Sequence, residues 1–505
     1  MRKLELITEI LKSAGATDVV MVGGCVRDKL LGIPSKDIDI EVYGLSYRQM
    51  AAALASSFKV NQVGQSFNVL KIDNVFDLTI PRRESKTGSG HKGFDVQADP
   101  SMTFEEAASR RDLTINAIGM RADGSIVDPF HGTEDLQAGI LRAPTEAFCE
   151  DPLRVLRAMQ FAARFGFDME PRTIELCQRV LPEFKTLSAE RVYMEWYKWA
   201  AKGKYPSKGL NVLCQTGWID CFPELAALRG VQQNPIWHPE GDVFTHTKLV
   251  CNAASQLASE ERLPEQDRVI LMFAALCHDF GKATSSFQDE TKNWRSPTHA
   301  QDGIAVTERF LNNLKPPLWL LENVIPLCAN HMIHTAAPDP SNPTDKMLRR
   351  LSAQLEPSNI YIWSLLCAAD LNGRTPKEDY KSKRQDKTEP AKTPHTENTS
   401  ASENTSASKN TSVSKKTDNS GETGKTAKAQ AFDSSVFRTW VERAKQLKID
   451  RQKPLPLLQG RDLLVRGIPA GPSMGAILKQ AWEAQLDGAF TDSDGAAKWL
   501  DENLD

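Results

Sequence analysis

Short runs of apolar residues, broken by glycine and polar positions, mark the beginning of the chain. Residues 18–22 form an apolar run that predicts a β-strand, and Gly23-Gly24 follows as a turn. Residues 26–31 are typical of the start of a helix, and a second strand is expected over 37–42. The N-terminal part is therefore expected to combine strands with helices.

This regular patterning stops between residues 376 and 431, where Lys, Thr, Ser, Asn and Glu predominate. Such a segment cannot bury enough apolar surface to offset its ordering entropy, so we expect a disordered low-complexity linker. Helix-like runs resume at 436–448 and 474–486. They predict a small C-terminal helical module over 432–505.

Length and composition favour a soluble enzyme of several domains. The chain has 505 residues, 40% of them hydrophobic, and no apolar run approaches the roughly 20 residues of a membrane span. Nine cysteines without Cys-x-x-Cys spacing indicate reduced core residues, and we expect a cytoplasmic protein without a membrane partner. The net charge of -3 does not itself indicate nucleic-acid binding, which depends on local clusters of Lys and Arg.

Two aspartates one residue apart, Asp37 and Asp39, lie on the predicted second strand. Residues i and i+2 of a strand point to the same face, so the two carboxylates converge, and a divalent cation shared with a substrate phosphate would relieve their repulsion. Upstream, Gly24 leaves backbone N–H groups accessible to a triphosphate, and Arg27 can form a charge-assisted fork with its oxygens. An Asp-x-Asp pair alone could also be a solvated strand end.

The element Gly23-Gly24-Cys25-Val26-Arg27-Asp28, at this distance from the aspartate pair, resembles the nucleotidyltransferases of the DNA polymerase beta superfamily. The resemblance is to the class II bacterial tRNA nucleotidyltransferases, or CCA-adding enzymes, and the poly(A) polymerases. It implies an α+β fold in which a polymerase-beta-like head with a mixed sheet precedes mostly α-helical modules. The implied divisions are a head over 1–145, a neck and body that bind RNA and the nucleobase over 146–230, and an HD domain over 231–375.

Further candidates in the head follow from strands and a loop downstream of the aspartate pair. Residues 67–72 and 75–80 are expected to form a strand pair with a tight turn at Asp73-Asn74. The resemblance makes Asp77 a candidate third catalytic carboxylate, although a solvent-facing strand aspartate is the alternative. The basic, glycine-rich stretch 82–94 is either a surface hairpin tip or a mobile lid beside the active site.

Two further motifs supply candidate nucleotide-binding residues. Arg111 and Asp112 lie in Arg-Arg-Asp-Leu-Thr-Ile-Asn, which matches the second motif of the resembled family. Asp151, Arg154 and Arg157 follow in Glu-Asp-Pro-Leu-Arg-Val-Leu-Arg, with both arginines on one helix face. The family implies that this element reads the incoming base. The alternative is an acidic helix cap followed by a basic face.

A second set of candidates suggests another metal site. His246, the adjacent His278-Asp279 and Asp370 resemble the ligands of the HD phosphohydrolase superfamily. Mixed imidazole and carboxylate ligands suit Mn, Fe, Ni or Mg better than a structural zinc. Three further histidines could complete a second metal position or contact a phosphate: His299, His331 and His334.

The resemblance as a whole implies template-independent addition of CCA to the 3′ end of tRNA from CTP and ATP, with Mg²⁺ and release of pyrophosphate. Poly(A) synthesis, or addition of only CC or only the terminal A, shares nearly every motif and remains an alternative. A second alternative makes HD phosphohydrolase chemistry the main activity. The expected partners are tRNA, CTP and ATP, and either a monomer or a homodimer fits the sequence.

Overall fold

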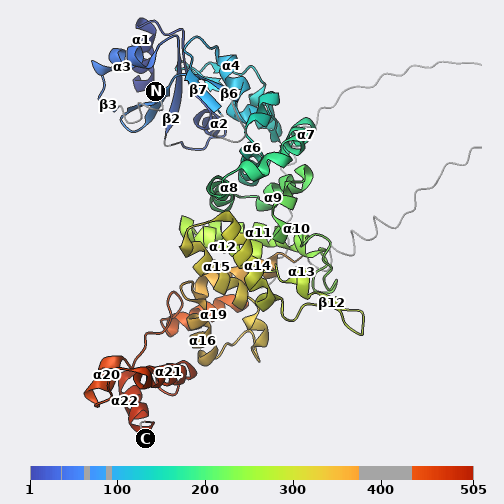
Figure 1. Ribbon diagram of the computed structural model, residues 1–505, viewed down its shortest axis with the longest axis vertical. Coiled ribbons are helices and arrows are strands. Elements are labelled where there is room, and N and C mark those ends of the chain that lie inside the picture. The colour runs from blue at the N-terminus through green and yellow to red at the C-terminus, as the bar shows by residue number, and fades with distance from the viewer. Residues whose placement is uncertain (1, 36, 62–68, 87–93, 375–434, 504–505) are drawn as a thin grey trace, which may run out of the picture.

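The computed structural model describes residues 2–35, 37–61, 69–86, 94–374 and 435–503. The predicted linker over 376–431 and the glycine-rich tip over 88–93 lie outside these ranges. The described parts form an elongated chain of domains, with the head at one end and the C-terminal helices at the other (Figure 1). This α+β architecture confirms the predicted fold class.

A seven-stranded mixed sheet in the order β3-β4-β5-β2-β1-β8-β9 forms the centre of the head. β2 and β5 are parallel, while the other pairs of neighbouring strands in this sheet are antiparallel. The strands are β1 (Asp18–Val22), β2 (Ile38–Tyr43), β3 (Val60–Asn61), β4 (Val69–Ile72), β5 (Phe76–Thr79), β8 (Gly119–Met120) and β9 (Ile126–Val127). The predicted first strand is confirmed at both ends, and the second is shifted by one residue, so that Asp37 directly precedes β2.

Helices flank this sheet, and a separate hairpin extends from it. The hairpin pairs β6 (Arg82–Lys86) with β7 (Phe94–Ala98), so the ends of the predicted loop are strands. Capping boxes fix the starts of two helices, because Ser46 and Thr103 each accept from the backbone N–H three residues on. The head helices are α1 (Arg2–Ser13), α2 (Gly24–Leu30), α3 (Tyr47–Ala55), α4 (Phe104–Ser109) and α5 (Gly132–Ala138).

The neck and body are built around α6 (Leu153–Phe165), which packs on α8 (Ala189–Lys202) and α9 (Pro206–Thr216). The apolar face of α6 is buried in the core, whereas Arg154, Arg157 and Arg164 of the same helix reach the cavity between neck and head. Shorter elements complete this region: β10 (Ile140–Leu141), β11 (Asp168–Met169), α7 (Pro171–Arg179) and α10 (Pro223–Ala226).

The next region is a bundle of helices around α17 (Ile360–Asn372). Buried residues occur all around α17, as expected for a helix surrounded by others in a bundle. The hairpin of β12 (Phe287–Gln288) and β13 (Trp294–Arg295) projects from the bundle (Figure 1). The other helices are α11 (Val243–Glu260), α12 (Glu265–Cys277), α13 (Lys282–Ser285), α14 (His299–Leu314), α15 (Leu318–Asn330) and α16 (Asp345–Leu355).

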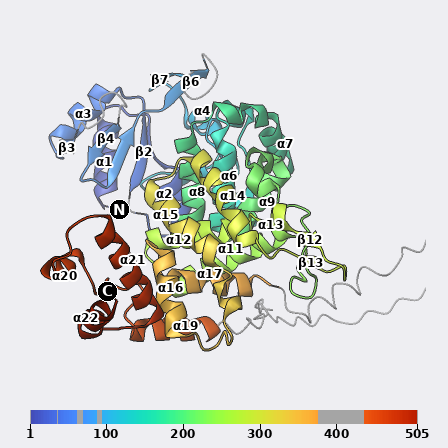
Figure 2. The same ribbon diagram turned by 60° about the horizontal axis from the view of Figure 1, so that its bottom comes forward.

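The C-terminal residues divide between two hydrophobic clusters. α19 (Ser435–Gln446) packs on α16 and α17 and belongs to the main core. The helices α20 (Gly460–Val465), α21 (Pro472–Asp487) and α22 (Ser493–Glu502) enclose a small core of their own and form a lobe beside α16 (Figure 2). None of the nine cysteines forms a disulfide. Among the described helices, none is both long and apolar enough to cross a membrane.

Candidate active sites

The predicted catalytic carboxylates lie on neighbouring parallel strands of the head. Asp39 on β2 is in register with Asp77 on β5, and Asp37 lies just before β2. Partial desolvation, followed by repulsion from Asp77 and Asp37, raises the pKa of Asp39. Lys71 Nζ lies 2.6 and 2.8 Å from the two oxygens of Asp77 and offsets part of this negative charge. Negative charges near enough to raise the pKa of Asp39 suit a hard divalent cation, although the three carboxylates are not among the described groups whose ligand atoms all lie within 4.8 Å of one another.

Arg111 is held against the glycine turn by two contacts. Its Nη2 lies 2.8 Å from Oε1 of Glu41, two residues after Asp39, and its Nη1 donates to the backbone carbonyl of Asn116. Gly23 has a φ of 71°, and a Cβ there would lie 3.1 Å from Nη1 of Arg111. The turn therefore needs glycine both for its left-handed backbone and for the close approach of this guanidinium.

Arg27 is buried at the boundary between head and neck. Its Nε and Nη2 lie 2.9 and 2.7 Å from Oδ1 of Asp28, and Nη1 donates to the side chain of Asn116. The guanidinium also packs on the rings of Phe161 and Phe165, whose centroids are 5.0 and 4.9 Å away. Its fork is thus already engaged by the protein, although it still lines the cavity described below.

Asp112 holds Arg157 through an ion pair in which two guanidinium nitrogens contact one oxygen of the buried carboxylate. Oδ2 of Asp112 lies 2.7 Å from Nε and 2.6 Å from Nη2 of Arg157, while Oδ1 accepts from Asn116 Nδ2 at 2.9 Å. Burial would raise the pKa of Asp112, but Arg157 and the hydrogen bond from Asn116 lower it overall. Asp112 therefore stays ionised and fixes one arginine of the neck relative to the head.

The other two neck residues are also oriented by polar contacts. Oδ1 of Asp151 accepts from the backbone N–H of Leu153 at 3.0 Å, and Oδ2 accepts from Nη2 of Arg191 at 2.7 Å. Arg154 donates from Nη1 to the carbonyl of Ala147 and from Nη2 to the carbonyl of Arg110, both at 2.6 Å. Asp151 and Arg154 thus hold fixed orientations at the start of α6.

One cavity of about 530 Å³ joins the head to the neck and collects all seven predicted nucleotide-binding residues. Its charged lining comprises nine Lys and Arg side chains against Asp112 and Asp151, which makes it suited to a polyanion. Five of these cations were not predicted: Arg110, Arg164, Arg191, Lys198 and Lys202. The spacing of Arg164 from Arg157, seven residues along the same helix, could have identified it.

The four predicted metal ligands of the second site meet inside the helical bundle. His246 Nε2 on α11 lies 2.9 Å from Oδ1 of Asp370 on α17 and 3.9 Å from Oδ2 of Asp279. His278 Nε2, at the end of α12, lies 3.2 Å from the same oxygen of Asp279. Burial would raise the pKa of Asp279, but His278 and Lys282 hold it well below its usual range. All four ligands are buried.

Three histidines of this cluster point their Nε2 atoms toward the centre of the cluster. The Nδ1 atoms of His278, His299 and His331 lie 2.9, 2.6 and 2.6 Å from backbone carbonyl oxygens. A carbonyl only accepts, so Nδ1 carries the proton and Nε2 presents a lone pair. The Nε2 atoms of His299 and His331 are only 3.1 Å apart, and burial lowers the pKa of His331 to about 3. A metal cation would relieve this convergence of lone pairs.

Glu240 and Lys282 belong to the second site but were not predicted. Oε1 of Glu240 lies 2.8 Å from Nδ1 of His246 and 2.9 Å from Nδ1 of His238, so one carboxylate orients two imidazoles. Lys282 Nζ lies 2.8 Å from Oδ2 of Asp279. Sequence could have indicated Glu240, because it lies two residues after His238 and six residues before His246.

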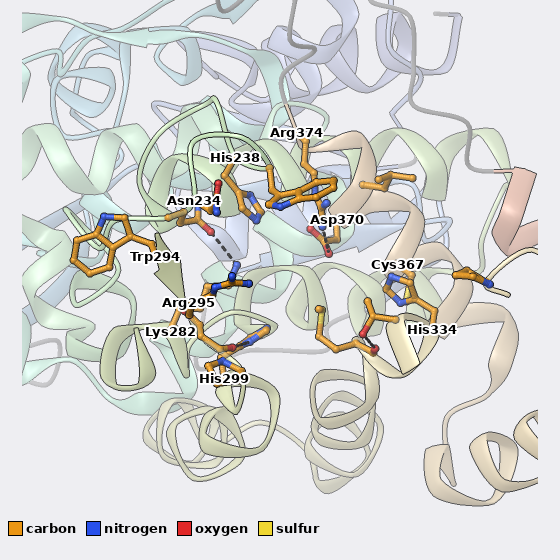
Figure 3. Close-up of a pocket in the computed structure, with 18 of the residues that line it drawn as sticks. Asn234, His238, Lys282, Trp294, Arg295, His299, His334, Cys367, Asp370 and Arg374 are labelled. Carbon is orange, nitrogen blue, oxygen red and sulfur yellow. Dashed lines mark hydrogen bonds and ion pairs between the residues drawn. The ribbon is translucent and has the colours of Figure 1, made fainter. Parts of the chain in front are cut away.

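A pocket of about 720 Å³ opens beside this cluster. Asp370, His299 and Lys282 reach it from the metal-ligating side, and Figure 3 shows Trp294 and His334 at its opposite ends. His334 is not among the described groups whose ligand atoms converge closely enough to share a metal ion. It belongs to the wall of the pocket, whereas His299 and His331 converge on Asp279.

Three known protein domains match successive segments of the chain. Residues 19–142 match the poly A polymerase head domain. Residues 166–228 match a domain described as a probable RNA and SrmB-binding site of polymerase A, and residues 243–360 match the HD domain. The fold and the two sites therefore define a nucleotidyltransferase that carries an HD domain, and both domain types imply the use of divalent metal ions.

More specifically, the chain belongs to the family of multifunctional CCA proteins. The proteins of Nitrosococcus oceani and Hahella chejuensis are each 38% identical to it over 363 residues. These alignments cover 71% and 70% of this chain and 85% and 82% of the relatives. The crystal structure of the Bacillus stearothermophilus CCA-adding enzyme in complex with CTP is 21% identical, covers 99% of this chain and 96% of that chain, and has a TM-score of 0.57. This last likeness supports the fold.

Proposed function

We propose that this tRNA nucleotidyltransferase adds C and A, as CCA, to the 3′ end of tRNA, using CTP and ATP and releasing pyrophosphate. The observation that carries the proposal is the cavity between head and neck, which brings Asp151 together with nine cationic side chains, Arg154 among them. A triphosphate needs the cations, and a nucleobase needs an oriented acceptor and donor. Family membership supports the same reaction.

In this mechanism Asp37 and Asp39 would hold Mg²⁺, with Asp77 as the candidate third carboxylate. A bound divalent cation would supply neutralisation of the phosphate charge. The RNA 3′-hydroxyl oxygen bonds in line to the α-phosphorus as the bond to pyrophosphate breaks, and the hydroxyl proton passes to solvent. Arg111 and the backbone at Gly24 would receive the triphosphate. Arg27 supports the wall of the cavity from its buried position on Asp28.

Asp151 and Arg154 would select the base. Asp151 can accept from the amino group of cytosine or adenine, while Arg154 donates to the adjacent ring nitrogen. Uracil and guanine present a carbonyl and a ring N–H at these positions, so they would face groups of the same hydrogen-bonding type. Each unsatisfied buried group costs about 1 to 3 kcal/mol, which supports selection without a template. Arg157 would add positive charge beside this pair.

The test supplies CTP and ATP separately to three purified RNAs: a tRNA transcript without CCA, one lacking only the final A, and an unstructured RNA. We expect C addition only to the first tRNA and A addition to the second. A long A tail on the unstructured RNA would instead identify a poly(A) polymerase. If the protein adds C to the first tRNA but no A to the second, it is restricted to CC addition. If it adds A to the second tRNA but no C to the first, it is restricted to the terminal A.

A second activity is favoured by the inward-facing Nε2 atoms of the HD cluster. We infer that His246, His278, Asp279 and Asp370 bind a divalent metal, with Ni, Mn, Fe or Mg as candidates, and that the site hydrolyses phosphate esters. Release of phosphate from a 2′-phosphate, or opening of a 2′,3′-cyclic phosphate, should be lost in His278→Ala and Asp279→Ala. Absence of hydrolysis by the unaltered protein with all four metals would contradict this second activity.

The setting of both reactions follows from the substrate. A tRNA-processing enzyme of this kind is expected in the cytoplasm, as a monomer or a homodimer. Light scattering coupled to gel filtration, with and without tRNA, distinguishes the two assembly states. A stable dimer whose dissociation abolishes C addition would show that assembly is needed for the head reaction.

A further inference from the structure

The lobe of α20 to α22 has a hydrophobic core of its own and follows the helical bundle after a short connection. Ser352 Oγ on α16 donates to the backbone carbonyl of Gln452 at 2.9 Å, which ties the chain to the bundle up to this residue. Gln485 of α21 donates to the carbonyl of Leu455 at 2.8 Å, which ties the chain to the lobe from there on. Two residues, 453–454, separate these contacts and provide a hinge.

The lobe also meets α16 through charged side chains. Lys346, Arg349 and Arg350 are spaced i, i+3 and i+4 and lie on one face of α16. Lys346 Nζ lies 3.0 Å from Oδ2 of Asp487, and Arg350 Nη2 lies 2.6 Å from Oδ1 of the same residue. Arg350 Nη1 lies 3.2 Å from Oε2 of Glu483, one turn earlier in α21. Cations of the bundle thus face carboxylates of the lobe, where α21 lies beside α16 (Figure 2).

The backbone at the end of α21 adds to this negative charge. Arg349 Nε donates at 3.1 Å to the carbonyl of Leu486, one of the last carbonyls of the helix. The C-terminus of a helix carries a partial negative charge, which favours a cation there. Gly488, with a φ of 85°, ends the helix and leaves room for the guanidinium of Arg349, which a Cβ would meet. The face of α16 therefore binds both carboxylates and backbone of α21.

This contact is open to water. The side chains of the three ion pairs are between 38 and 55% exposed. Exposed ion pairs stabilise a protein little, and salt screens them. The hydrophobic cluster of the lobe is also separate from the main core, so a shared core does not hold the lobe on α16. Another anion can therefore take the place of the end of α21.

The backbone of RNA is such an anion. Its phosphates accept charge-assisted hydrogen bonds from Lys and, in a fork, from Arg. The head–neck cavity, at about 530 Å³, accommodates only the 3′ end of a tRNA together with a nucleotide. The rest of the substrate has phosphates that this cavity does not meet. A cationic face elsewhere on the enzyme can bind them.

We propose that Lys346, Arg349 and Arg350 form a surface that binds RNA phosphates, and that the end of α21 covers this surface until RNA displaces Glu483 and Asp487. The lobe then turns about residues 453–454. This inference rests on the proposed action on tRNA. It adds to that proposal an RNA contact on the helical bundle and a lobe whose position depends on RNA.

The first test measures binding of a fluorescent tRNA transcript without CCA to the full chain by anisotropy. Glu483→Gln combined with Asp487→Asn should tighten binding by about tenfold at low salt, because the cations of α16 become available to phosphate. Asp494→Asn combined with Glu502→Gln removes the same charge from α22 and is the matched control. The control should change the Kd less than twofold. Unchanged binding in the α21 variant would overturn the proposal.

A variant of α16 separates a defined surface from an effect of net charge. Lys346→Gln, Arg349→Gln and Arg350→Gln together should weaken binding. Relative to the α21 variant, the slope of log Kd against log salt should fall by about three, one for each lost phosphate contact. Adding the two α21 substitutions to this triple variant should change the Kd less than twofold, because the surface that they uncover is gone. Tenfold tightening in the triple variant would overturn the proposal, since net charge alone would explain it.

The position of α21 can be followed in the unaltered protein. A water-soluble carbodiimide should join Lys346 to Asp487 as an amide, because Nζ and Oδ2 lie 3.0 Å apart, and mass spectrometry measures the linked peptide. Saturating tRNA should reduce its yield by about fivefold or more, because RNA and α21 compete for the same cations. The link between Lys498 and Glu502, both on α22, should keep its yield. An unchanged yield of the first link would overturn the displacement of α21.

Neither measurement requires CTP, ATP or a metal ion, so both are independent of the reaction in the head. Tightened binding in the α21 variant and a link suppressed by tRNA, in a protein that adds neither C nor A, would contradict only the proposed nucleotide addition. Full addition of C and A, together with a link that tRNA leaves unchanged, would overturn only the inference about α16 and α21.

Discussion

The head–neck cavity and the HD cluster are prepared for opposite charges. In the cavity, protein carboxylates orient guanidinium groups, as Glu41 does for Arg111 and Asp112 for Arg157, so the site offers fixed cations to an anionic ligand. In the cluster, backbone carbonyls orient imidazoles, so the site offers fixed lone pairs to a cation. In both sites, the groups that would meet the ligand are held in place by other groups of the protein.

The two regions also differ in how they are assembled. The cavity is formed by residues of the head and of α6 and α8, so its geometry depends on the packing of two domains. The HD cluster lies within one bundle, where every proposed ligand is buried. The first site should therefore be sensitive to contacts between domains, and the second to the loss of single ligands.

The largest expected effect separates the two regions completely. Asp39→Ala should reduce C and A addition by about a thousandfold or more, because the several kcal/mol supplied by the bound cation are lost. HD hydrolysis should be unchanged, since Asp39 lies in another domain. Asp123→Ala, at an exposed head carboxylate, serves as the control. Incorporation of labelled CTP at the level of the unaltered protein would refute the proposed role of Asp39.

The reciprocal change removes a ligand from the HD cluster. His278→Ala should reduce phosphate release by about a hundredfold and lower the metal content measured by mass spectrometry, because the lone pair of Nε2 is removed. CCA addition should remain within twofold. His131→Ala, at an exposed histidine of the head, should change neither activity. If metal content and hydrolysis both survive in His278→Ala, His278 is a structural residue.

Local motifs of these two sites could be predicted from the sequence, whereas contacts between distant residues could not. The aspartate pair, the glycine turn and the His278-Asp279 pair are local patterns, so their residue types and spacing identified them. The ion pair between Asp112 and Arg157 joins residues 45 positions apart and depends on how α6 packs on the head. Sequence predicted both residues, but not that one orients the other.

The β4–β5 hairpin shows how a single residue limits such predictions. A two-residue turn at Asp73-Asn74 would place Ile72 opposite Val75. In the structure both turn residues have positive φ, as expected, but Val75 is also part of the connection and Ile72 pairs with Phe76. This register places Lys71 opposite Asp77 and creates their ion pair. The charge balance beside Asp39 therefore depends on one extra loop residue.

A smaller effect tests the ion pair between Asp112 of the head and Arg157 of the neck, since the head–neck cavity depends on contact between domains and the HD cluster does not. Asp112→Asn should lower kcat/KM for CTP and for ATP by about ten- to a hundredfold, because Arg157 loses its charged partner at a cost of about 1 to 3 kcal/mol. HD hydrolysis should not change. Asp168→Asn, which removes an exposed ion pair with Lys208, is the matched control. Equal kinetics in Asp112→Asn and the control would refute the positioning role of Asp112.

The smallest effect concerns the cost of burying imidazole in the HD bundle. Burial lowers the pKa of His238 to about 4, from about 6.5 in the unfolded chain. Between these two pH values the unfolded state binds more protons than the folded state, so this histidine makes the free energy of unfolding fall as the pH drops. His238→Gln keeps a donor for Glu240 but cannot titrate. With metal removed by a chelator, lowering the pH from 7.5 to 5.5 should destabilise the unaltered protein by about 1 kcal/mol more than this variant, as measured by urea denaturation.

His131→Gln, at an exposed position, should behave like the unaltered protein. If the free energy of unfolding depends on pH in the same way in the unaltered protein and in His238→Gln, burial does not hold His238 neutral. The contrast between neutral imidazoles in the HD bundle and fixed cations in the head–neck cavity would then not extend to His238.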